Sequence, residues 1–257
     1  MLVRSLSRRD VLRAGAGAAA FAVGPRAAAS ETRIDKLIVE TQPLPTVAQR
    51  IELISRGLIG TPYVANTLIG TATTPEKFVI RDDAFDCVTY CETVLAAAIA
   101  RTPEGFADAL RTIRYHNGVV EWRERNHYFF EWGEHNIENK TVRAITMDGE
   151  VEIKKAVTWH KELGERHFDM HVIPRAVLLA NKDKLMTGDI IAFVNRLPNM
   201  DYFHTGFIVF GAKNEFLLRH ASEVRGRVVD EDMARFTVQY GIDYVTLWRP
   251  LEPSKAV

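Results

Sequence analysis

Apolar residues first recur at helical spacing just after residue 46. The stretch carries four of them on one face of a helix: Val47, Ile51, Ile54 and Leu58. Thr46 and Gln49 stand at the spacing of a capping box, in which each residue satisfies a backbone N–H at the start of a helix. The pattern therefore predicts a helix that begins here and ends near Gly57 or Gly60.

A second helix is predicted from about Phe85–Cys87 to about Arg101, after a loop that follows the first. Its residues 94–100 are an almost unbroken apolar run, which is typical of a helix buried on most sides. A third helix should follow at Pro103, because proline is favoured in the first turn, and should extend to about Tyr115.

The last 70 residues lack the helical spacing of the earlier segments, and their composition favours strands. Four segments rich in β-branched and aromatic residues are bounded by turn formers: residues 189–194, 203–210, 215–220 and 244–249. Lys213-Asn214 suits a hairpin turn between the second and third of these segments. Helices that come first and strands that come later, without regular alternation, predict an α+β fold with an antiparallel sheet.

The middle of the chain mixes aromatic and charged residues and has a weaker pattern. We interpret residues 119–170 as an aromatic and basic insertion that shapes a groove. The remaining predictions are strands near 141–146 and 151–158 joined by a turn at Asp148-Gly149, a short helix over 174–180, and an extended lead-in over 30–45.

The amino terminus has the pattern of an export signal. Ser7-Arg8-Arg9 begins a twin-arginine motif, an apolar stretch follows over residues 14–23, and Ala27-Ala28-Ala29 offers small residues to a signal peptidase. Because about 20 apolar residues are needed to cross a bilayer, this stretch indicates a removable signal rather than an anchor. We expect residues 1–29 to be the signal peptide of an exported, periplasmic protein.

Charge and length limit the function classes of the rest of the chain. Residues 1–29 hold five basic residues and one acidic residue, so residues 30–257 keep 28 basic and 32 acidic side chains and a net charge of −4. This balance argues against a general nucleic-acid binder, which needs a basic face. We expect residues 30–257 to form a single domain without a membrane-spanning segment.

The candidate chemistry lies in one cysteine and two distant histidines. Cys87 stands at the start of the apolar helix, whereas His204 and His220 lie 16 residues apart on two strands of a predicted hairpin. The second cysteine, Cys91, is one helical turn further along, and residues so spaced have poor geometry for a disulfide.

A helix start and a neighbouring imidazole both favour the thiolate form of a cysteine. One histidine can then act as the base while the other orients it, and backbone N–H groups can hold an oxyanion. The residue types alone leave a second possibility open, because a free cysteine on an apolar helix is often only part of the core.

Other clusters suggest weaker sites. His160, His167 and His171 lie close together, but no glutamate directly follows His167 as a zinc-protease motif requires, so we predict no metal site. Arg125, together with neighbouring basic residues, can hold a substrate carboxylate or form a solvated surface.

The order of these motifs resembles the NlpC-type cell-wall cysteine peptidases, and more closely their exported N-acetylmuramoyl-L-alanine amidase-like branch. The similarity covers roughly residues 46–250. The motifs that carry it are Gly60-Thr61-Pro62-Tyr63, Phe85-Asp86-Cys87, Gly188-Asp189-Ile190, His204-Thr205-Gly206, His220-Ala221-Ser222 and the aromatic and basic segment 125–132.

The resemblance implies a papain-like α+β core and a role for each matched residue. Cys87 would be the nucleophile, His204 the base and His220 the orienting residue. The substrate would contact four residues: Tyr63, Asp86, Arg125 and Tyr128. No cofactor is implied.

The implied function is hydrolysis of an amide bond in peptidoglycan or its muropeptide fragments through a thioester. Val64-Ala65-Asn66 stands where the superfamily often has Trp-Gly-Gly, so the usual preference for a γ-D-glutamyl bond does not carry over. The alternatives are an inactive wall-binding protein on the same fold and a thiol acyltransferase. The sequence indicates no oligomeric state.

Overall fold

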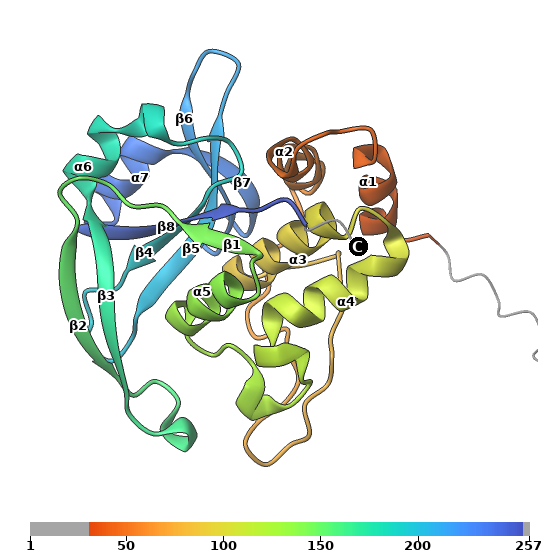
Figure 1. Ribbon diagram of the computed structural model, residues 1–257, viewed down its shortest axis with the longest axis horizontal. Coiled ribbons are helices and arrows are strands. Elements are labelled where there is room, and N and C mark those ends of the chain that lie inside the picture. The colour runs from red at the N-terminus through yellow and green to blue at the C-terminus, as the bar shows by residue number, and fades with distance from the viewer. Residues whose placement is uncertain (1–30, 254–257) are drawn as a thin grey trace, which may run out of the picture. The chain divides into compact units, whose positions relative to one another are not determined.

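The computed structural model describes residues 31–253 and contains an antiparallel sheet of eight strands, beside which helices α1–α4 are grouped (Figure 1). The strands are β1 (Val142–Ala144), β2 (Val151–Val157), β3 (Arg166–Pro174), β4 (Ile190–Val194), β5 (Tyr202–Phe210), β6 (Phe216–Ser222), β7 (Arg227–Asp232) and β8 (Tyr244–Pro250). Their spatial order is β2-β3-β8-β4-β5-β6-β7, and β1 pairs with β8. The predicted signal peptide lies outside the described residues.

Seven α-helices in the described part of the chain pack against the sheet or against helix α3. They are α1 (Arg33–Thr41), α2 (Val47–Gly57), α3 (Cys87–Ala100), α4 (Pro103–Arg114), α5 (Phe129–Glu138), α6 (Arg175–Ala180) and α7 (Met233–Gln239). One apolar core joins helices α1–α5 to the sheet, and a second core lies under α6 and α7. The α+β class with an antiparallel sheet is therefore confirmed.

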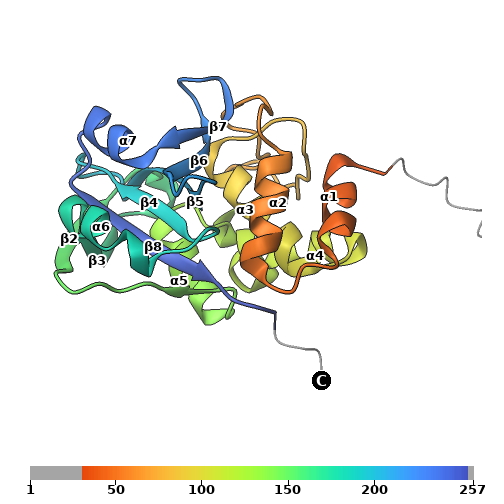
Figure 2. The ribbon, with the colours of Figure 1, turned by 90° about the horizontal axis from the view of Figure 1, so that it is seen from above.

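The most buried helix is α3, as its apolar sequence predicts. Ten consecutive residues from Thr89 to Ala98 are buried. Figure 2 shows α3 between the sheet and helices α1, α2 and α4. Its first residue is Cys87, so the predicted start of this helix is confirmed, and so are the starts of α2 at Val47 and α4 at Pro103.

The predicted extended lead-in over residues 30–45 is wrong, because these residues contain α1. Thr32 and Asp35 form a capping box at its start. Ile34, Leu37 and Ile38 follow at helical spacing and are buried. Burial of this apolar face against the other helices favours the helix over an extended chain.

The middle of the chain contributes to the main sheet. The predicted strands near 141–146 and 151–158 exist, but they do not pair with each other: β1 pairs with β8, and β2 pairs with β3. Helix α5 and strand β3 were not predicted. Close packing positions α5, because a Cβ atom on Gly133 would lie only 2.6 Å from the Trp248 ring.

Strand β7 and helix α7, at the end of the sheet that carries the histidines, were not predicted from the sequence pattern. Strand β7 pairs with β6, and α7 packs over both.

Within residues 31–253, every helix is too short or too polar to cross a membrane.

Candidate active site

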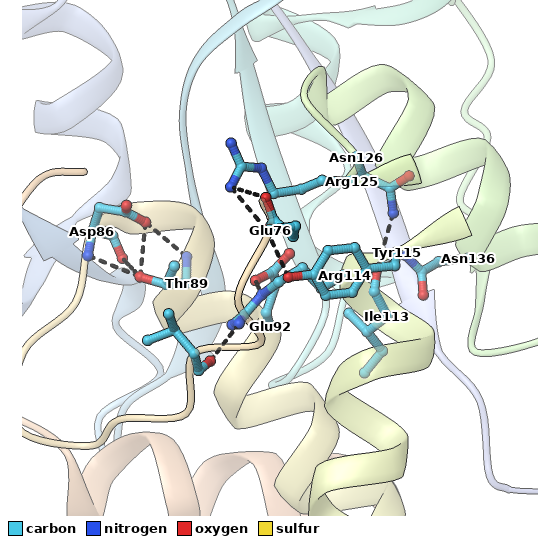
Figure 3. Close-up of polar contacts among 11 residues, drawn as sticks. Glu76, Asp86, Thr89, Glu92, Ile113, Arg114, Tyr115, Arg125, Asn126 and Asn136 are labelled. Atoms are coloured by element: carbon cyan, nitrogen blue, oxygen red, sulfur yellow. Dashed lines mark hydrogen bonds and ion pairs between the residues drawn. The ribbon is translucent and has the colours of Figure 1, made fainter. Parts of the chain in front are cut away.

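Cys87 lies at the first position of α3, where a helix has backbone N–H groups without partners inside it. Asp86 caps this end. Its Oδ1 atom accepts hydrogen bonds from the backbone N–H and the hydroxyl of Thr89, both at 2.8 Å (Figure 3). The cap fixes the direction in which α3 begins, and thereby the position of Cys87.

The thiol of Cys87 is neutral in the resting protein. The residue keeps some contact with solvent, but burial of the sulfur, with a smaller effect of Asp86, raises its pKa to about 12. The N–H groups of Thr205, Val88 and Cys87 itself act in the opposite direction but do not offset burial. The helix start therefore does not produce a thiolate by itself, contrary to the expectation from position alone.

Two histidines come together on neighbouring strands. His204 on β5 and His220 on β6 are joined by a hydrogen bond of 2.6 Å between Nε2 of the first and Nδ1 of the second. Gly206 makes this approach possible, because a Cβ atom there would lie 2.9 Å from that of His220. The expected proximity of the two histidines is present in the structure.

Both imidazoles are held in the neutral form. Burial lowers the pKa of His204 well below its ordinary value, and the nearby His220 lowers it further. The rings of Phe193, Phe203 and Phe236 surround His204 at centroid distances of 6.2, 6.3 and 5.8 Å. Burial also lowers the pKa of His220, whereas the carboxylate of Glu231 raises it.

Helix α3 packs against β5, which brings the cysteine to the histidine strand. The backbone N–H of Thr205, the residue after His204, acts on the Cys87 sulfur. One turn further along α3, the Cys91 sulfur lies 3.8 Å from the Thr205 hydroxyl. Cys91 is fully buried and belongs to the core.

A small cavity of about 110 Å³ adjoins the histidine pair. Its lining consists of Phe203, His204, His220, Ser222, Glu223, Val224, Phe236 and Tyr240. The lining combines aromatic and apolar side chains with Ser222 and Glu223, so the cavity can receive a small group next to His204.

Tyr63 lies beside the cysteine. A bridge pairs it with Phe85 just ahead of α3, and the N–H of Val64 donates to the Phe85 carbonyl at 2.9 Å. Burial raises the pKa of Tyr63 to about 12, and electrostatic interactions with the Cys87 thiol, Glu223 and Asp86 add to this effect. The hydroxyl is therefore protonated and can donate a hydrogen bond near the thiol.

Arg125 makes its contacts in a buried network near α4 (Figure 3). Its Nη1 atom lies 3.0 Å from Glu76 Oε1, and the Tyr115 hydroxyl donates to the same oxygen at 2.8 Å. Tyr128 is also buried, and its hydroxyl accepts from the backbone N–H of His160 at 3.1 Å. These contacts hold loops together, and the substrate-binding roles of Arg125 and Tyr128 stay predictions.

Glu231 is a polar partner that sequence reasoning missed. Its Oε2 atom lies 2.9 Å from His220 Nε2, and its Oε1 atom accepts from Arg225 at 3.0 and 3.1 Å. It lies in the acidic run Asp230-Glu231-Asp232, which looks like a solvated strand edge. Only recognition of β7 as the partner of β6 would have placed it beside His220.

The protein has a mixed α+β fold in which the helix that begins with Cys87 packs on the strand that carries His204. The model of the AmiA-like family, described as N-acetylmuramoyl-L-alanine amidase-like, matches residues 53–240. The chain belongs to this family.

Solved structures share the fold. A Legionella pneumophila protein matches at 22% identity and a TM-score of 0.75, over 86% of this chain and 94% of that one. An N-acetylmuramoyl-L-alanine amidase from Bacteroides uniformis matches at 25% identity and a TM-score of 0.66, over 77% of this chain and 97% of that one. No curated protein matches the chain.

Proposed function

We propose that this protein is a cysteine amidase that hydrolyses an amide bond in peptidoglycan or its muropeptide fragments. Membership of the amidase-like family supports the substrate class. One observation carries the mechanism: the helix start with Cys87 packs on Thr205, next to a histidine that is hydrogen-bonded to a second histidine. A papain-like core, as in other thiol hydrolases, is part of this proposal.

The neutral thiol requires a base at the moment of attack. His204 Nε2 is engaged with His220, so Nδ1 is the atom that takes the thiol proton. The sulfur then bonds to the substrate carbonyl carbon, and N–H groups at the start of α3 stabilise the oxyanion. His204 gives the proton to the leaving amine as the C–N bond breaks, which leaves a thioester on Cys87.

Water completes the cycle. His204 removes a proton from a water molecule, the hydroxide attacks the thioester, and the C–S bond breaks. The thiol takes its proton back from His204, and the carboxylic acid leaves. The same two proton transfers thus serve acylation and deacylation, and no step requires another reagent.

Substrate contacts are proposed for two polar groups that interact electrostatically with the thiol, Asp86 and Tyr63. Asp86 uses Oδ1 for both of its capping bonds, which leaves Oδ2 for a substrate N–H. The protonated hydroxyl of Tyr63 can donate to a substrate carbonyl.

We also propose that the protein is exported by its amino-terminal signal, which fits a substrate in the cell wall.

The test is digestion of peptidoglycan and defined muropeptides, with the products identified by mass spectrometry. Native protein should release fragments whose masses identify the bond, and Cys87→Ser should release none. Transfer of the acyl group to an added amine instead of water would support the acyltransferase alternative. Binding without cleavage by native protein would contradict the proposal and support a wall-binding protein.

A further inference from the structure

Three side chains on three neighbouring strands form a continuous hydrogen-bonded line. His204 on β5 contacts His220 on β6 at 2.6 Å, and His220 contacts Glu231 on β7 at 2.9 Å. The side chain of His220 is 2% exposed and that of Glu231 is 17% exposed. Arg225 binds the other carboxylate oxygen of Glu231, so Oε2 faces the histidine.

The chemistry of the donors allows one arrangement of protons along this line. An ionised carboxylate only accepts, so His220 Nε2 must carry the proton of their hydrogen bond. In a neutral imidazole the other nitrogen then has a lone pair, so His220 Nδ1 accepts and His204 Nε2 donates. His204 Nδ1 consequently has a lone pair as well.

We propose that Glu231 is a positioning residue that fixes the tautomers of both histidines, so that His204 presents a basic Nδ1 to Cys87. The inference rests on the proposed thiol chemistry of Cys87. Without the carboxylate, the His220 proton can move to Nδ1. His204 must then accept at Nε2 and carry its own proton on Nδ1, where it cannot take one from the thiol.

Glu231 also acts on the charge that forms during the reaction. When His204 takes the thiol proton, it becomes a cation hydrogen-bonded to His220. A carboxylate at the far end of the line stabilises this cation through the polarised imidazole. The charged groups that face His220 are Glu231, Asp230 and Arg225, and Glu231 has the largest effect of these.

Two substitutions separate the tautomer from the charge. In Glu231→Gln the amide oxygen can still accept from His220 Nε2, so both histidines keep their native tautomers and only the negative charge of the carboxylate is lost. In Glu231→Leu the hydrogen bond that fixes the tautomers and the negative charge are both lost. We expect kcat to fall about 10-fold in the first and by about 10²- to 10⁴-fold in the second, the range of a lost general base, with little change in KM.

Asp232→Asn is the matched control, because Asp232 is the next residue on β7 and caps α7 through Arg235. Asparagine also caps helices, so this variant should behave like native protein. Nitrogen NMR of the imidazoles gives a readout that needs no turnover. Native protein and Glu231→Gln should show both histidines protonated on Nε2, and Glu231→Leu should show His220 protonated on Nδ1.

The outcomes distinguish this inference from the proposed function. If Cys87→Ser is inactive while Glu231→Leu keeps kcat within threefold and native tautomers, Glu231 has no positioning role. If native protein cleaves no muropeptide, the proposed function fails, and the imidazole spectra still decide the tautomer assignment. If Glu231→Leu does not fold, the activity of Glu231→Gln and the nitrogen NMR spectrum of native protein test the inference instead. Protonation of His220 on Nδ1 in native protein would overturn it.

Discussion

The Nε2 atom of His204 lies 2.6 Å from the Nδ1 atom of His220, although 16 residues separate them in the chain. A β-hairpin creates this relationship, because side chains that are diagonal to each other on adjacent strands can touch. The hydrogen bond leaves only Nδ1 of His204 available to a reacting group.

His220 should therefore support activity because its Nδ1 atom accepts the hydrogen bond from His204 Nε2. We expect His220→Ala to lower kcat by about 10²-fold or more, since the base loses its orientation. His220→Asn should retain more activity than His220→Ala, because its Oδ1 can accept from His204 Nε2. Steady-state kinetics on a muropeptide checks this order, and equal rates for native protein and His220→Ala would refute it.

The pH profile of activity should be flat around neutrality. The pKa of His204 is well below 6.5 and that of Cys87 is about 12, so base and thiol both keep their resting forms in between. The acidic fall in kcat/KM should lie well below pH 6.5. Alkylation of Cys87 by iodoacetamide should be slow at pH 7 and become faster towards pH 12. Rapid alkylation at pH 6 would show instead that the resting cysteine is a thiolate.

Acid should destabilise the fold through its neutral histidines. Burial lowers the pKa of five of them: His127, His135, His160, His204 and His220. Below pH 6.5 the unfolded chain binds protons that the folded protein does not, so the free energy of unfolding falls as pH falls. The raised pKa values of Glu92, Glu131, Glu134 and Asp201 oppose this effect in part, so we expect a modest net loss of stability between pH 7 and pH 5, measured by urea denaturation.

One variant and one control test this explanation. The pKa of His127 is lowered to about 4, so His127→Gln should make the pH dependence of stability less steep. The side chain of His167 is 75% exposed, so His167→Gln should leave the slope unchanged. Identical slopes in native protein and both variants would contradict a contribution from His127.

A buried ion pair between α3 and α4 should support the helix that carries Cys87. Arg114 Nε lies 2.7 Å from Glu92 Oε2, and their side chains are 3% and 2% exposed (Figure 3). Arg114→Leu should cost about 3–5 kcal/mol of stability, because it leaves a buried carboxylate without its partner. The double variant Arg114→Leu/Glu92→Leu should recover much of this loss in urea denaturation. A single variant as stable as native protein would contradict this role.

The sequence predicted those parts of the fold whose signals are local. Thr46 with Gln49, and Pro103, mark helix starts that the structure confirms. The hairpin that joins His204 to His220 was also readable, because its strands are adjacent in the chain and Asn214 adopts the left-handed backbone that its turn needs.

The parts that could not be predicted depend on distant segments. Strand β3 pairs with β8 about 70 residues later in the chain, and β1 pairs with β8 more than 90 residues away, so neither of these two pairings follows from local pattern. Glu231 reaches His220 only because β7 pairs with β6. Burial raises the pKa of Cys87, and the position of Cys87 in the sequence does not reveal this burial.

The most direct test of the central claim compares kcat/KM for native protein, Cys87→Ser and Cys91→Ala on the muropeptide that native protein cleaves. Cys91 lies on the same helix, fully buried, and serves as the matched control. A nucleophilic Cys87 predicts a loss of at least about 10³-fold in Cys87→Ser and a change of no more than a few-fold in Cys91→Ala. A rate for Cys87→Ser within tenfold of native would show that the sulfur of Cys87 does not attack the substrate.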